Sequence, residues 1–105
     1  MADIAATPSP PYYAVIFTSK RSENDLGYAD TSERMIALAR QQKGFLGFES
    51  AKEELGITVS YWASLESIKQ WKSQTEHKEA QRLGQKTWYA AYKVRISKVE
   101  RDYGV

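Results

Sequence analysis

The sequence predicts an α+β domain in which a four-stranded antiparallel sheet carries helices on one face only. Two observations predict this class. Segments with strand character and segments with helical spacing follow one another in the order β-α-β-β-α-β, which is the split βαβ pattern. The 105 residues are enough for one hydrophobic core and too few for two.

Four segments have the composition of strands. The first, residues 12–18, is aromatic and β-branched and is followed by the turn-rich residues 19–27. Because it is apolar on both faces, we expect it to be central in the sheet. Residues 45–54 and 57–62 should form an antiparallel hairpin around a turn at Leu55-Gly56.

The last predicted strand is long and alternates clearly. It spans residues 88–100, in which the apolar Tyr92, Val94 and Ile96 alternate with polar side chains. Strict alternation is typical of a strand with one covered face and one polar face.

The first predicted helix spans residues 28–42. Its larger apolar residues, Met35, Ile36, Leu38 and Ala39 among them, cluster on one side, and Lys43-Gly44 provides the stop.

The second helical region is predicted in two pieces. Ser64 is a candidate N-cap for a short helix that carries Ile68 and Trp71 on one stripe. The sequence Ser73-Gln-Thr-Glu76 matches a capping box, so we expect a break near Ser73 and a new helix with His77 on its apolar face.

The two ends of the chain differ in composition. Residues 1–10 contain Thr7-Pro8-Ser9-Pro10 and little that could pack, so we expect a disordered or extended arm. Residues 11–105 are predicted to form a single domain.

Composition argues against several classes of function. The net charge is +2 and basic residues are interspersed with acidic ones, so a nucleic-acid partner is not expected. No apolar run is long enough for a membrane helix and no export signal is evident, so we expect a cytoplasmic protein without a membrane partner. The sequence has no Cys, one His and no phosphate-binding or nucleophile motif, so no metal and no cofactor is expected.

The predicted arrangement of one sheet with helices on one face is enough to predict a homodimer. If helices cover one face of the sheet, the other face needs a second cover. A second subunit is the simplest cover, because a monomer rarely exposes so large an apolar patch.

Several short motifs follow one another in an order that resembles the antibiotic-biosynthesis-monooxygenase family. The resemblance covers about residues 12–101, and its order and spacing are more specific than any single motif. The motifs are Gln42 to Ser50 (QKGFLGFES), Gly56 to Ser64 (GITVSYWAS), Trp71, Glu76-His77, Ala80-Gln81 and Trp88-Tyr89.

This resemblance implies a ferredoxin-like fold that assembles as a dimeric α/β barrel, with a pocket between each sheet and its helices. Several relatives oxidise polycyclic aromatic molecules with dioxygen and without metal or flavin. A haem-degrading branch uses an Asn on the first strand, a Trp on the helix after the hairpin and a His further along that helical region. Trp71 matches that Trp by position, but the Asn and His positions correspond here to Phe17 and Gln81, so haem degradation is not expected.

The residues predicted to form the site come from that pocket. His77 is the candidate catalytic base, since a side chain that titrates near neutral pH can accept a phenolic proton. The alternative for His77 is a structural role, bonded to backbone or a carboxylate. The candidate substrate-binding residues, each of which could instead be ordinary core, are Trp71, Trp88, Phe48, Met35 and Leu38.

Three functions remain open at this stage. The first is a cofactor-independent monooxygenase, or related oxidoreductase, acting on a small aromatic quinol or polyketide-like molecule. The second is a non-catalytic dimeric module that binds a small molecule or acts in a stress response. The third is a purely structural dimer without a cavity.

Overall fold

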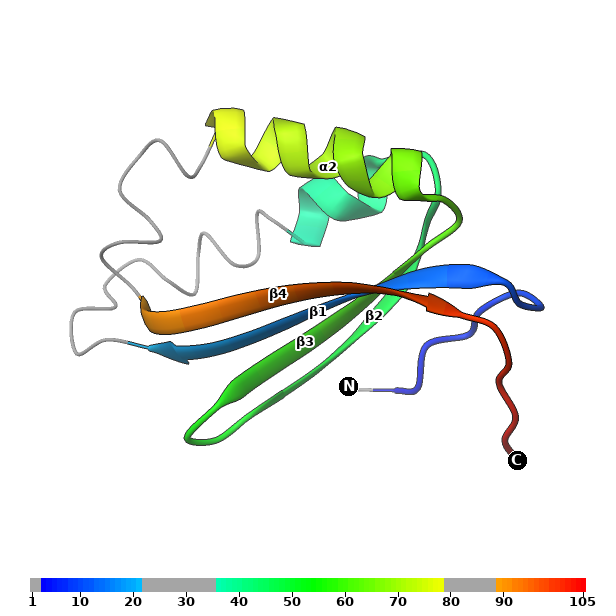
Figure 1. Ribbon diagram of the computed structural model, residues 1–105, viewed down its shortest axis with the longest axis horizontal. Coiled ribbons are helices and arrows are strands. Elements are labelled where there is room, and N and C mark those ends of the chain that lie inside the picture. The colour runs from blue at the N-terminus through cyan, green and yellow to red at the C-terminus, as the bar shows by residue number, and fades with distance from the viewer. Residues whose placement is uncertain (1–2, 22–35, 79–88) are drawn as a thin grey trace.

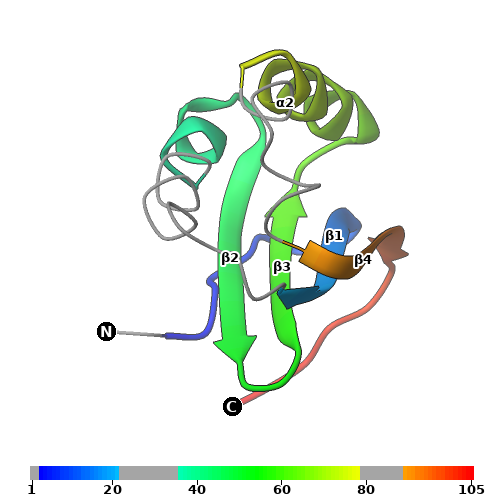
Figure 2. The ribbon, with the colours of Figure 1, turned by 90° about the vertical axis from the view of Figure 1, so that its left-hand side faces the viewer.

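The computed structural model describes residues 3–21, 36–78 and 89–105, and in this part of the chain it contains the predicted antiparallel sheet with helices on one face (Figure 1). The strands are β1 (Tyr12–Arg21), β2 (Phe45–Lys52), β3 (Gly56–Trp62) and β4 (Tyr89–Val99), in the sheet order β2-β3-β1-β4 (Figure 2). The order βαββαβ is confirmed.

β1 is an interior strand, as its two apolar faces predicted. It pairs antiparallel with β3 on one side and with β4 on the other. The strand continues to Arg21, so the prediction that Ser19 belongs to a turn is wrong. Ser19 pairs with Gly56 and with Tyr92 and is buried, and pairing on both sides overrides its turn propensity.

The predicted hairpin of β2 and β3 is confirmed, with a small shift of its turn. β2 ends at Lys52 and not at Glu54, and residues 53–55 make the connection. Gly56, predicted to be in the turn, opens β3 and pairs with Lys52. The backbone N–H of Glu53 donates to the carbonyl of Leu55 across 3.0 Å, which closes the loop.

The first helix is described over residues 36–41, and residues 28–35 of the prediction lie outside the described residues. The helix stops before Gly44, as expected. Gly44 has φ of +94°, and a Cβ at this position would collide with the side chain of Ser67. This turn therefore needs glycine both for its backbone conformation and for the close approach of the next helix.

α2 (Leu65–Lys78) begins as predicted, with the hydroxyl of Ser64 accepting the backbone N–H of Ser67 at 3.1 Å. The break expected near Ser73 is wrong, because α2 is one continuous helix of 14 residues. Ser73 is exposed, and no Pro or Gly interrupts residues 65–78. A capping-box pattern marks the start of a helix only where the preceding helix has ended. No residue within α2 ends the helix, so it continues through Ser73.

The core lies between the helices and the face of β1 that carries Tyr13, Val15, Phe17 and Ser19, here called the helix side. Its buried centre consists of Val15, Ala39, Trp62 and Ile68. Trp62 has 0% exposure and is the largest fully buried side chain in the described residues. Because the buried ring of Trp62 contacts Trp71, it packs β3 against α2.

The opposite face carries Tyr12, Ala14, Ile16 and Thr18 of β1 and is here called the helix-free face. Both chain ends pass beneath it (Figure 1). The backbone N–H of Ala5 donates to Glu49 at 3.0 Å, and the hydroxyl of Thr7 donates to that of Tyr12 at 3.1 Å. The hydroxyl of Tyr12 in turn donates to Asp102 of the C-terminal tail at 2.6 Å.

A second tyrosine completes this network. The hydroxyl of Tyr61 donates to Glu49 at 2.6 Å, and the rings of Tyr12 and Tyr61 meet edge to face with centroids 5.9 Å apart. Burial, together with the bond to Glu49, raises the pKa of Tyr61 to about 12. The bond to Asp102 raises the pKa of Tyr12 as well.

We expect the stability of the protein to fall as pH rises between about 10 and about 12. The folded chain keeps the Tyr61 proton to a higher pH than the unfolded chain, whose tyrosine has the ordinary pKa of 10.0. The contribution of Tyr61 to stability is therefore fully present below pH 10. It is lost as the pH rises through the pKa of Tyr61 in the folded state. Urea unfolding at about pH 9 and about pH 11 measures the loss, which should shrink in Tyr61→Phe. An equal loss in the variant would contradict this origin.

Candidate functional site

The candidate site lies on the helix side of the sheet, where α2 crosses β3. The ring of Trp71 lies against that of Trp62, with centroids 5.1 Å apart and planes tilted by 32°. Phe45 meets Trp62 edge to face at 5.3 Å. Three aromatic rings from β2, β3 and α2 thus form one wall between the sheet and the helix, here called the aromatic wall (Phe45, Trp62 and Trp71).

The two tryptophans of the aromatic wall differ in their hydrogen bonding. The indole N–H of Trp62 donates to the hydroxyl of Ser60 at 2.9 Å. The Nε1 atom of Trp71 is buried and has no hydrogen-bond partner within the described residues, although the side chain as a whole is half-buried. A buried donor left unpaired costs about 1–3 kcal/mol, so this N–H is a candidate binding group.

A second pair of rings lies on the same side of the sheet, further along β1. Phe17 stacks on Tyr92 with centroids 5.6 Å apart. Tyr92, Val94 and Ile96 of β4 are 45%, 47% and 50% exposed, and their register with Ser19, Phe17 and Val15 puts them on the helix side. The described helices therefore leave an apolar strip of β4 uncovered on this side.

Phe48 also lies on the helix side, opposite Ser60 of β3. The guanidinium of Arg40, from the first helix, lies over its ring at 5.4 Å from the centroid, a distance at which a cation is attracted to an aromatic face. Arg40 thus places a positive charge beside the ring of Phe48. A guanidinium in this position can pair with an anionic oxygen on an aromatic ligand.

Of the residues predicted to form the site, three can be placed. Trp71 and Phe48 are on the helix side, and Leu38 is half-buried in the first helix, where its carbonyl accepts the side-chain amide of Gln42 at 3.2 Å. Met35 and Trp88 lie outside the described residues. His77 lies near the end of α2, on the same helix as Trp71, and its side chain is outside the described part.

The sequence interpretation missed two residues on the helix side, Arg40 and Phe17. Arg40 was not singled out because nothing local distinguishes it from other surface cations. Phe17 was considered only as a mismatch to a haem-degrading relative, and its contact with Tyr92 joins strands β1 and β4. The alternation of Tyr92 and Val94 was the one signal that could have indicated this apolar strip of β4.

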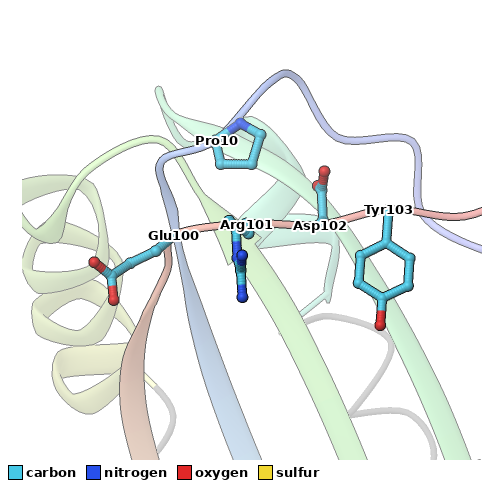
Figure 3. A pocket seen from close by; sticks show the side chains of 5 residues that line it. All are labelled: Pro10, Glu100, Arg101, Asp102 and Tyr103. Atoms are coloured by element: carbon cyan, nitrogen blue, oxygen red, sulfur yellow. The ribbon is translucent and has the colours of Figure 1, made fainter.

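A surface hollow of about 350 Å³ lies elsewhere, where the C-terminal tail passes the start of β1 (Figure 3). It is open to solvent, and Tyr103 at its rim is fully exposed. None of the predicted site residues lines it, so it is not the candidate site. Its lining residues are Pro10, Glu100, Arg101, Asp102 and Tyr103.

Two further properties bear on the chemistry. Within residues 3–21, 36–78 and 89–105, no three His, Asp or Glu side chains gather in the way a metal site requires. In the same part of the chain, neither helical segment is long and apolar enough to cross a membrane.

Residues 11–83 match the family model described as antibiotic biosynthesis monooxygenase. The chain is 54% identical over 101 residues to the uncharacterized protein YqjZ of Bacillus subtilis (strain 168), a match that covers 94% of this chain and 89% of that protein.

Solved structures agree on the fold. A variant of SnoaB, described as a cofactor-independent oxygenase from Streptomyces nogalater, superposes with a TM-score of 0.72 at 8% identity and covers 87% of this chain and 95% of that one. A conserved protein from Methanosarcina mazei superposes with a TM-score of 0.69 at 13% identity, covering 88% and 94%. At these identities the likeness supports the ferredoxin-like fold alone.

Proposed function

Because this chain belongs to the antibiotic biosynthesis monooxygenase family, we propose that it is a cofactor-independent monooxygenase acting on a small aromatic quinol or polyketide-like phenol. The observation that carries the proposal is the buried indole N–H of Trp71 at the aromatic wall, which has no hydrogen-bond partner in the described part of the chain. SnoaB, which has the same fold, is described as a cofactor-independent oxygenase and supports the proposed chemistry.

The ligand is proposed to lie against the aromatic wall beside Trp71 and to accept the Trp71 N–H through a carbonyl or phenolate oxygen. Such a bond would offset the cost of burying the N–H without a partner, so the ligand needs a hydrogen-bond acceptor such as this oxygen. Arg40, over the ring of Phe48, would favour the anionic form of the ligand. The substrate class is therefore a planar ring that carries an ionisable oxygen.

His77 is the proposed general base. It follows Trp71 by six residues on the continuous α2, which corresponds to about 9 Å along the helix axis. The two positions also differ by about 120° around the helix, so the ligand would have to lie along the side of α2 between them. Removal of a phenolic or enolic proton would make the ring electron-rich enough to react with dioxygen.

The oxidation itself would take place on the substrate. The anion gives one electron to dioxygen, and the resulting radical pair combines into a peroxide at a ring carbon. The peroxide takes up the proton on its outer oxygen. The ring carbon then loses its remaining hydrogen as the O–O bond breaks, so the inner oxygen stays as a carbonyl and the outer one leaves as water. The protein supplies proton transfer, orientation and a site shielded from solvent.

The proposal includes a homodimer formed through the helix-free face. Ile16, Val59 and the 42% exposed Ile57 belong to this face by the register of the sheet. Both described helical segments lie on the other side of the sheet (Figure 1). Burying these apolar side chains against a second copy would remove apolar area from water, and stable interfaces of this kind bury on the order of 2,000 Å² in total.

The test is incubation of the full chain with a panel of quinols and anthrones, under air and under nitrogen, followed by mass spectrometry. The proposal predicts a product in which one oxygen atom replaces two hydrogen atoms of the substrate, as when a CH₂ group becomes a carbonyl, under air alone. Binding without any oxygen-dependent product would support the non-catalytic binding module instead.

Haem is expected not to be degraded, even if it binds. Phe17, at the position of the Asn in the haem-degrading branch, stacks on Tyr92 and has no hydrogen-bonding group in its side chain. Gln81 replaces the imidazole, and an amide is a poor iron ligand. The visible spectrum of haem mixed with the protein and a reductant should keep its Soret band, and loss of that band with release of iron would contradict the prediction.

A further inference from the structure

We propose that the hydroxyl of Ser60 donates a second hydrogen bond to the ligand oxygen that accepts the Trp71 N–H, so that two neutral donors hold the ionised form of this oxygen. The inference rests on the proposed function and adds a residue to its site. It is carried by the burial of Ser60, by the hydrogen bonding of its hydroxyl and by its place in the sheet.

Ser60 is a buried polar residue in the middle of a largely apolar surface. It is 6% exposed, and its neighbours across the sheet are Phe48 on β2 and Val15 on β1. Burial of a hydroxyl is unfavourable unless its hydrogen bonds are satisfied, whereas an alanine would fill this position without that cost. The bonding of the Ser60 hydroxyl is therefore informative.

Only one side of this hydroxyl is used within the described residues. Its oxygen accepts the indole N–H of Trp62 at 2.9 Å. A serine hydroxyl also has a proton of its own to donate, and in the described part of the chain the bond from Trp62 is the one bond that Ser60 Oγ makes. The proton of Ser60 is thus a second buried donor beside the aromatic wall, in addition to the N–H of Trp71.

The register of the sheet places Ser60 between the aromatic wall and the rings further along β1. Trp62 and Thr58 lie two residues to either side of Ser60 in β3, so the three side chains share the helix side. Thr58 is opposite Phe17. Ser60 is therefore about 7 Å along the strand from each of these rows, and a ligand ring over Phe17 that reaches toward Trp71 passes over it.

Two neutral donors on one oxygen favour its ionised form. A phenolate or enolate oxygen can accept more than one hydrogen bond, and bonds to an ionised acceptor are stronger than bonds to a neutral one. The Trp71 N–H and the Ser60 O–H together therefore lower the pKa of the bound phenol. They act as the donors of an oxyanion hole do, because they stabilise the charge that remains after the proton has left.

The experiment is a pH titration of 2-hydroxyanthraquinone bound to the full chain, followed by absorbance, because the anion of this dye absorbs at longer wavelength than the neutral form. The proposal predicts that the ionisation constant of the bound dye falls about tenfold in Ser60→Ala. It should return toward the wild-type value in Ser60→Thr, which keeps a hydroxyl.

The matched control is Ser50→Ala. Ser50 is opposite Thr58, so it is on the same side of the sheet, but it is exposed at the edge strand β2 and its hydroxyl is bonded to that of Thr58 at 3.1 Å. Removing this hydroxyl should change the ionisation constant of the bound dye less than about twofold.

The charged and titratable groups around the site are the same in all these proteins, so a difference between variants belongs to the hydroxyl that is changed. They are His77, Arg40 of the first helix, Lys52 and Lys98 on the helix side of the edge strands and, exposed on α2, Glu66, Lys69 and Lys72.

The ionisation of the dye separates a binding role of Ser60 from a structural one. If Ser60 only accepts the Trp62 N–H, Ser60→Ala weakens the binding of neutral and ionised dye alike, and an unchanged ionisation constant would overturn the proposal. If Ser60→Ala fails to fold, Ser60→Cys replaces it, because a thiol is a weaker donor and should also lower the constant. Absence of an oxygen-dependent product from quinols and anthrones would overturn the proposed oxidation and leave this titration to decide the role of Ser60. A wild-type chain that does not bind the dye would overturn recognition by both donors.

Discussion

Replacing His77 by Ala is expected to lower the turnover of a phenolic substrate about 10²-fold, because the group proposed to accept its proton is removed. The measurement is oxygen consumption at saturating substrate. Binding of the substrate should change much less, since the aromatic wall and the N–H of Trp71 are retained. A fall in turnover without a matching fall in affinity is typical of a group that acts in the chemical step.

The control for this experiment is Gln74→Ala, an exposed position on the same helix. It should keep the activity of the wild type, and circular dichroism should show both variants folded. Wild-type turnover in His77→Ala would remove the catalytic role of His77. In that case the phenolic proton leaves by another route.

Replacing Trp62 by Ala is expected to cost about 3–5 kcal/mol of unfolding free energy. Trp62 has 0% exposure, contacts Phe45 and Trp71, and has its indole N–H satisfied by Ser60. Its removal leaves a cavity at the centre of the core and takes away the donor to the Ser60 hydroxyl. Urea unfolding at a fixed protein concentration measures the loss, since a dimer's stability depends on concentration.

Leu65→Ala serves as the control, because Leu65 is 54% exposed at the start of α2. Its cost should stay below about 1 kcal/mol. A loss below about 1 kcal/mol in Trp62→Ala would mean that the core collapses around the missing ring, and the aromatic wall would then not be the rigid support that the site requires.

The strands could be predicted because each has a local signal. β1 is aromatic and β-branched over most of its length, and β4 alternates apolar and polar residues, so both the order of elements and the interior place of β1 followed from composition. Their ends could not be predicted as well. Ser19 has the local character of a turn residue, and only its pairing with strands on both sides keeps it in β1.

The error in α2 has a different cause. A Ser followed three residues later by Glu is compatible with a helix start and with the exposed side of a continuous helix. The decisive fact, that the chain does not turn at Ser73, is not local to that motif. The expectation of two helices there was therefore wrong. Trp71 and His77 were both predicted to be helical, and both belong to α2.

The candidate site was predicted in part. Trp71 was identified through its resemblance to a family position, and the structure adds a buried N–H that has no hydrogen-bond partner among the described residues. Arg40 over Phe48 and the stacking of Phe17 on Tyr92 depend on contacts between distant segments. The same holds for the bonds from the arm to Glu49, because a Pro-rich end shows no local sign of where it will lie.

The most direct test of the central claim is the affinity of the wild type and of Trp71→Phe for a hydroxylated anthraquinone, measured by calorimetry. The substitution keeps an aromatic ring at the wall and removes the N–H. We expect a dissociation constant about tenfold higher in Trp71→Phe, the loss that corresponds to one hydrogen bond of about 1.4 kcal/mol. Equal affinities in the two proteins, or no binding to the wild type, would contradict the assignment of this N–H as the group that recognises the ligand.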